Sequence, residues 1–272
     1  MRPIWILLAA IIGVELLGQS AQGQDSGGVV KEGKRLYLSN CAVCHGQNGD
    51  GKGPAATQLT VKPRDFQGGV FKFRSTPSGS LPRDNDIDAT LIRGVRGTAM
   101  VPQRHLRAAE RQAVIAYLKT FSERFKREQP GAPVKVPSPP PATPTVIAQG
   151  REIYRKAQCA ECHGEGGRGD GPSARTMKDD RGFPLAVPDL TQRPLKRGSE
   201  PEALFYTITT GLNGTPMPSY SDSLDPGEIW ALVRYLDSLA PSKRRQPLDR
   251  LLPGEETIGQ KIEEEARRAS AR

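Results

Sequence analysis

The sequence predicts an all-α protein of two tandem domains joined by a proline-rich linker. Two observations indicate the duplication: a Cys-x-x-Cys-His run occurs twice, and the residues around it recur at matching positions. A third observation predicts helices. Each copy ends in a stretch, about 108–121 and 226–239, whose apolar residues recur at three- and four-residue steps. This spacing buries one face of a helix.

The two Cys-x-x-Cys-His runs occupy residues 41–45 and 159–163. This spacing is the attachment signature of c-type haem, in which two thiols bond to the vinyl groups of the porphyrin and the adjacent imidazole reaches the iron. The chain contains four cysteines, so the two runs use every thiol. We therefore expect two covalent haem c groups. The predicted attachment and iron-binding residues are Cys41, Cys44, His45, Cys159, Cys162 and His163.

Zinc sites and thioredoxin-like redox pairs also use Cys-x-x-Cys. The two runs here lie much further apart than the cysteine pairs of an ordinary zinc ribbon. A thioredoxin-like motif leaves the histidine after the second cysteine unexplained in both copies. Haem attachment is the interpretation that uses all three residues.

The sixth iron ligand is predicted to be a methionine, because His/Met ligation is established in cytochromes c. Met100 and Met217 follow the haem histidines at nearly equal intervals, each in a Gly- or Pro-containing stretch that favours a rigid loop. Filling a gap in the core is the alternative role for a methionine. His105 follows Met100 closely and could replace it, although a solvated surface histidine is the simpler interpretation.

Each copy shows the same succession of features around its haem motif. A glycine precedes the motif, a Gly-rich stretch ending in proline follows it, and a Met loop and a terminal helix with an aromatic residue come last. In this succession each copy resembles a class I cytochrome c domain. The resemblance covers about residues 29–125 and 146–241, which we predict as the two domains.

The resemblance implies two sets of contacts. The first and last helices of the family cross closely, which would place Gly33 and Gly150 at the crossings. The family also uses a proline carbonyl to accept a hydrogen bond from the haem histidine, which fixes the ring orientation. Pro54 and Pro172 are the corresponding candidates, with an ordinary turn as the alternative.

The remaining segments lie at the ends of the chain and between the domains. Residues 1–23 have a positive start, a short apolar run and a small-residue cleavage site, which predicts a Sec-type signal peptide; an uncleaved anchor is the alternative. The proline-rich linker, residues 126–145, is expected to be an extended spacer, and whether it straps along a domain interface stays open. The charged residues 242–272 are expected to be a solvated tail, and the alternative is that they dock onto a partner protein.

The charge of the chain bears on its partners. A formal net charge of +9 suits a protein that meets redox partners with acidic docking faces. Arg93 and Arg96 precede the Met100 loop and either belong to a solvated basic face or neutralise haem carboxylates. Nucleic acid is not expected as a partner of an exported haem protein.

The prediction for function is a periplasmic dihaem cytochrome that relays single electrons between respiratory redox partners. A His/Met-ligated haem has no open position, so neither an enzymatic activity nor a small-molecule substrate is expected. One alternative is a haem subunit of a larger respiratory oxidoreductase complex, with a membrane complex as one form, since residues 63–77 resemble stretches of dihaem cytochromes associated with such enzymes. The other is a dihaem peroxidase-like enzyme whose first haem lacks Met100 as a ligand.

Overall fold

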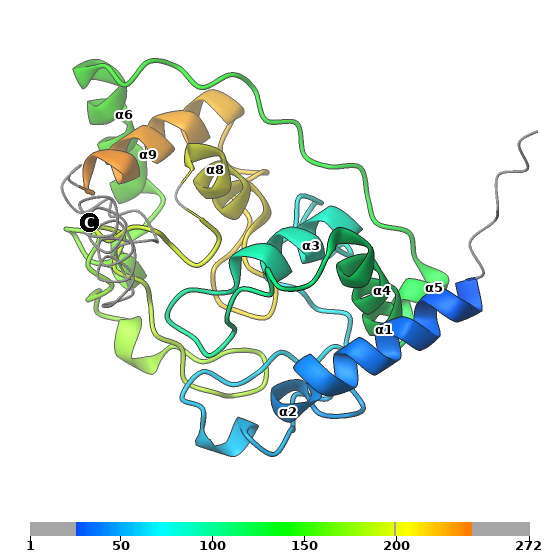
Figure 1. The fold of residues 1–272 in the computed structure, drawn as a ribbon. Helices are drawn as coiled ribbons and strands as arrows, with labels where there is room; N and C mark the ends of the chain where they lie inside the picture. Colours follow the sequence, from blue (N-terminus) through cyan, green and yellow to red (C-terminus); the bar gives the residue numbers. More distant parts are fainter. Residues whose placement is uncertain (1–25, 199, 241–272) are drawn as a thin grey trace, which may run out of the picture.

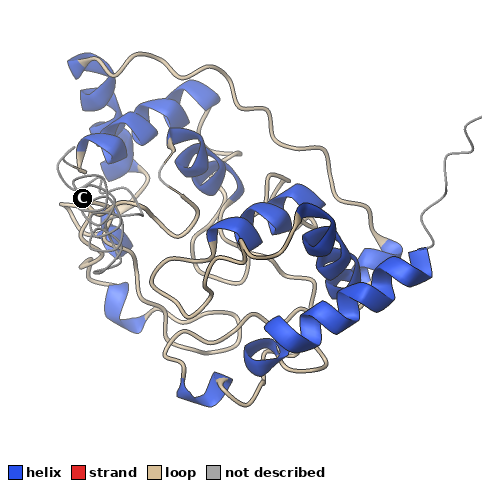
Figure 2. Ribbon diagram, in the orientation of Figure 1, coloured by secondary structure: helices blue, strands red, loops and turns tan. Residues whose placement is uncertain are grey.

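A computed structural model describes residues 26–198 and 200–240. The predicted signal peptide and the charged tail, residues 242–272, lie outside them. The described part of the chain is helical and contains no β-strand beyond two isolated bridges, which confirms the all-α class (Figure 2). None of its helices has both the length and the apolar character needed to cross a membrane.

The helices of the two halves follow the same order, as the duplication predicts (Figure 1). The first half contains α1 (Ser26–Asn40), α2 (Ala42–His45), a 3₁₀ turn (Ala56–Gln58), α3 (Asp84–Arg93), α4 (Ala108–Lys119) and α5 (Arg124–Arg127). The second half contains α6 (Pro144–Lys156), α7 (Ala160–His163), a 3₁₀ turn (Ala174–Thr176), α8 (Pro201–Thr210) and α9 (Pro226–Ser238). Only α5 lacks a counterpart among the described elements of the second half.

In each half the first helix packs against the last long helix, α1 on α4 and α6 on α9 (Figure 1). A Cβ atom at Gly33 would overlap the carbonyl oxygen of Ala113, and one at Gly150 would overlap that of Ala231. Only glycine permits this backbone-to-backbone approach. The two crossings implied by the resemblance are therefore confirmed.

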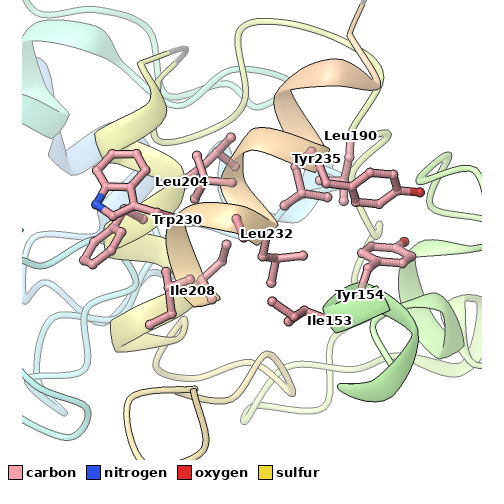
Figure 3. Packing of buried hydrophobic residues seen from close by; sticks show 13 residues of the cluster. Ile153, Tyr154, Leu190, Leu204, Ile208, Trp230, Leu232 and Tyr235 are labelled. Atoms are coloured by element: carbon pink, nitrogen blue, oxygen red, sulfur yellow. The ribbon is translucent and has the colours of Figure 1, made fainter. Parts of the chain in front are cut away.

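The core of each half lies around this crossing. Figure 3 shows the second core, where the apolar face of α9 meets side chains of α6 and α8. The rings of Trp230 and Phe205 are tilted relative to each other, with centroids 4.9 Å apart. Tyr154 meets Tyr235 edge to face with ring centroids 5.4 Å apart. The matching pair in the first half has the same separation and nearly the same interplanar angle. Both aromatic pairs lock the crossing helices.

The linker is extended, as predicted, and it is fastened along its length. The amide of Val134 donates to the carbonyl oxygen of Ser75 in the first half at 2.8 Å. Further along, Trp230 donates from its indole nitrogen to Pro137 at 3.0 Å, and Arg234 donates to Pro140 at 2.8 Å. The linker therefore lies as a strap against both halves, which answers the question that the sequence left open.

The two halves also meet directly, through arginine side chains that donate to backbone carbonyl oxygens of the other half. The donor–acceptor pairs are Arg74 with Thr210, Arg96 with Arg193 at 2.7 Å, Arg181 with Pro63 at 2.8 Å and Arg197 with Arg74 at 2.8 Å. Arg74 is fully buried. Arg96 is thus bound to a carbonyl group of the other half, a role that the sequence did not predict.

Replacement of Gly150 by alanine should destabilise the second half by about 1–3 kcal/mol, because the added Cβ forces α6 away from α9. Urea unfolding followed by circular dichroism measures the loss. Gly166→Ala is the matched control, since a Cβ there meets only the flexible side chain of Arg168, at 3.8 Å. Equal stability of the two variants would contradict the tight crossing.

Candidate functional site

Each Cys-x-x-Cys-His run forms a single helical turn directly after the first helix of its half. In the first half the amides of Cys44 and His45 donate to the carbonyl oxygen of Cys41, at 3.1 and 2.9 Å. The second run repeats both bonds from Cys159. All four thiols are free and half-buried. Burial raises the pKa of the Cys41 and Cys159 thiols to about 11, so both stay protonated at neutral pH.

The loop after each histidine is tied back to the first helix. The hydroxyl of Tyr37 donates to the carbonyl oxygen of Gly46 at 2.8 Å, and that of Tyr154 donates to Gly164 at 2.7 Å. Gly46 and Gly164 have φ values of 77° and 76°, a region that favours glycine. The glycine after each motif therefore lets the chain turn back sharply beside the histidine.

The imidazole of His45 is oriented by a carbonyl group from a later segment. Its Nδ1 lies 2.9 Å from the carbonyl oxygen of Arg64, which leaves Nε2 available for a metal. In the second half, His163 Nδ1 interacts with the backbone of Pro188 but does not reach hydrogen-bond geometry. Burial lowers the pKa of both imidazoles, which favours the neutral form that metals bind.

The assignment of Pro54 and Pro172 as acceptors for the histidines is wrong. The Gly-rich loop that ends at each proline folds onto the backbone of the haem motif instead: Gly53 donates to the carbonyl oxygen of Cys44 at 3.1 Å, and Gly171 donates to that of Cys162 at 3.3 Å. The chain reaches the imidazole only later, at Arg64 and Pro188. Nothing local in the sequence marks these two carbonyl groups.

The two Met loops share the hydrogen bonds that hold the methionine backbone. The amide of Met100 contacts Thr98 Oγ1 at 3.1 Å and its carbonyl oxygen accepts from Val95 at 2.8 Å. Met217 repeats both bonds, at 3.3 Å from Thr215 Oγ1 and at 3.1 Å from Leu212. Val101, where the second copy has proline, adds a bond from its amide to the carbonyl oxygen of Ala99 at 3.0 Å but leaves the two bonds of the methionine in place.

Each half contains a cavity that brings its predicted residues together. The first, of about 400 Å³, is lined by Cys41, Cys44, His45 and Met100. The second, of about 200 Å³, is lined by Cys159, Cys162, His163 and Met217. Most of the other lining residues are apolar. The structure therefore assembles all eight predicted site residues as two equivalent sets.

Two further residues bear on the sixth ligand. His105 is exposed, lies 3.1 Å from the amide oxygen of Asn40, and does not line the first cavity. Met177 does line the second cavity, but it follows a 3₁₀ turn as Leu59 does in the first half. Its position is that of an apolar wall residue. The geometry thus favours Met100 over His105 as the sixth ligand in the first half, and Met217 over Met177 as the sixth ligand in the second half.

The residues present fit a covalently bound haem in each cavity. Two thiols, a neutral imidazole and a thioether face one mostly apolar space. Among the described residues no group of three or more His, Cys, Asp and Glu side chains forms a conventional metal site. A haem held in this way supplies one-electron Fe(III)/Fe(II) chemistry.

Comparisons with known proteins agree with this arrangement. Residues 30–122 match the family model for cytochrome c, and residues 145–236 match that for cytochrome c oxidase, cbb3-type, subunit III. Together with the two haem-binding sets, these matches define a tandem cytochrome c. The chain belongs to the cytochrome c family as a dihaem protein with two domains in series.

Curated relatives include the cbb3-type cytochrome c oxidase subunit FixP of Bradyrhizobium diazoefficiens, 27% identical over 78% of this chain and 61% of its own length. Subunit CcoP of Azospirillum brasilense is 26% identical over 78% of this chain and 62% of its own length. The chain thus spans about three fifths of these relatives. A solved chain of the Kuenenia stuttgartiensis reducing HAO-like protein complex Kustc0457/Kustc0458 is 44% identical, with a TM-score of 0.76, over 78% of this chain and 96% of that one.

The comparisons overturn one prediction from the sequence. A periplasmic location was expected from residues 1–23, but the curated relatives are subunits of an oxidase. The periplasmic assignment is therefore wrong. The predicted signal peptide concerns only residues outside the described part of the chain.

Replacing Met217 by alanine should make one haem high-spin and able to bind carbon monoxide, because no other thioether takes its place. The sulfur-to-iron charge-transfer absorption of that haem should vanish while that of the other haem persists. Met177→Ala, the control in the same cavity, should leave the spectrum unchanged. A spectrum that responds to Met177→Ala and not to Met217→Ala would reverse the assignment.

Proposed function

We propose that this chain is a dihaem electron-relay subunit of a larger respiratory oxidoreductase complex. The main support for electron relay between the two haems is that the two cavities adjoin, since Lys72, Phe73 and Lys196 line both of them. Two haems in these cavities would be separated by little more than a few side chains. The relatives named above support membership of a complex, since each is a subunit or a chain of one.

In this proposal each domain holds its haem in the same way. The thiols of the motif bind the porphyrin covalently, the imidazole supplies one axial ligand and Met100 or Met217 supplies the other. The apolar walls exclude water from the haem. With both axial positions filled, the chain itself has no catalytic residue, and chemistry on a substrate would belong to a partner subunit. The proposed domain limits remain residues 29–125 and 146–241.

The partner would be a redox protein that presents an acidic face. The net charge of +9 supports this, as does the exposure of Val43, beside Cys44, and of Val101, beside Met100. Exposed apolar side chains beside the motif and the Met loop, on a chain with a positive net charge, suit a contact that is steered by charge and released quickly. A membrane-associated complex is one setting for such a contact.

The first part of the proposal, that each domain binds its own haem, is tested by the covalent haem content. A variant with Cys41 and Cys44 both replaced by alanine should retain one haem per chain, and so should the variant at Cys159 and Cys162. Haem staining on a denaturing gel, with the pyridine haemochrome spectrum as a second measure, counts the haems. Two haems in either variant would refute the pairwise attachment.

The second part of the proposal, that the chain is a subunit of a complex, is tested by the size of the native particle. We expect the chain, extracted gently from its own cells, to run with additional protein on a native gel stained for haem. Mass spectrometry of that band should identify an oxidoreductase subunit. A haem-stained band at the mass of the single chain, with no accompanying protein at any salt concentration, would favour a free carrier instead.

A further inference from the structure

Lys72 and Lys196 lie where the two cavities adjoin. Lys72 belongs to the loop before α3, and Lys196 belongs to the loop before α8. Each of them lines the cavity of its own half and also that of the other half. The boundary between the two cavities therefore carries one cation from each domain.

Neither of these two cations forms a direct ion pair in the described part of the chain, and the carboxylates of Asp179 and Asp180 attract Lys72 only from a distance. No Asp or Glu among the described residues lines either cavity, and neither lysine forms a hydrogen bond or salt bridge with a described residue. Burial, together with repulsion from Arg64 and Lys196, lowers the pKa of Lys72 to about 8. The pKa of Lys196 is also lowered by burial. Burying unpaired charges in this way is costly, so the site is complementary to an anion.

A haem supplies such an anion. Its vinyl groups, on one edge, are taken by the cysteines, and its propionate carboxylates lie on the opposite edge. Arg93 and Arg96, the candidates from the sequence, line neither cavity. We propose that Lys72 and Lys196 form one shared cationic site that binds propionate groups of both haems. This proposal rests on the proposed haem occupancy and goes beyond it.

A shared site couples the two haems electrostatically. A positive charge beside an iron favours its ferrous form, and a pair of close charges in a poorly hydrated site interacts strongly. Removing one lysine at the boundary therefore lowers the reduction potential of both haems. A lysine that lines one cavity affects one haem only.

The test uses the haem-loaded full chain and its two single-haem cysteine variants. In each background, Lys72→Gln should lower the ferrous-to-ferric ratio at a fixed electrode potential by about tenfold, equal to about 59 mV for a one-electron couple. Spectroelectrochemical titration reads the ratio for one haem at a time. Lys196→Gln is the reciprocal variant and should act in both backgrounds, whereas Lys72→Arg should keep the parent values.

Lys62→Gln is the matched control, because Lys62 lines only the first cavity and donates to the carbonyl oxygens of Ala56 and Thr57. It should shift the first haem alone. Lys72→Gln and Lys196→Gln each acting on a single haem, or on none, would overturn the shared site while leaving the haem count intact. Absence of covalent haem from the unsubstituted chain would overturn the proposed function itself.

Discussion

The contact on which each domain depends is the crossing of its first and last helices at a glycine. At Gly33 and Gly150 the backbones of two helices touch, so the first helix has a single position along the last. The haem motif follows that helix within one turn, and its position is thereby set as well. A tyrosine from the same helix then holds the carbonyl oxygen beyond the haem histidine. A shift at the crossing would thus be carried directly into the cysteines and the imidazole.

The contact between the domains follows a different principle. It is built from arginine side chains that donate to carbonyl oxygens, and the linker is fastened by donors to its proline carbonyl groups. Such acceptors are present at every residue, so two loop-rich surfaces can be joined without a matched apolar face. The fully buried Arg74 both donates to Thr210 and accepts at its carbonyl oxygen from Arg197. The bond from Arg197 joins the two loops that carry Lys72 and Lys196, and the bond to Thr210 ties the first of these loops to the end of α8.

The sequence predicts what depends on local spacing and misses what depends on loop placement. The haem motifs and the terminal helices follow from covalent chemistry and from helical periodicity, and the Met loops from glycine and proline positions. The helix crossings followed from the resemblance to class I cytochromes c, and the duplication doubles each signal. The acceptor carbonyl of Arg64 and the shared lining by Lys72 and Lys196 belong to irregular segments without any period. The localisation expected from residues 1–23 was wrong because the pattern of an export signal carries no information about assembly with other subunits.

The position of these cations also changes what the net charge means. A value of +9 suggested a basic surface, yet Arg74 is fully buried, and Arg197, Lys72 and Lys196 are withdrawn into the domain contact or the cavities. If the cavities take haem carboxylates, part of the excess is neutralised within the molecule. The charge available to a partner is then smaller than the formal count and lies on residues away from the boundary. Two functions of basic residues, holding the haems and attracting the partner, are therefore separated in space within one chain.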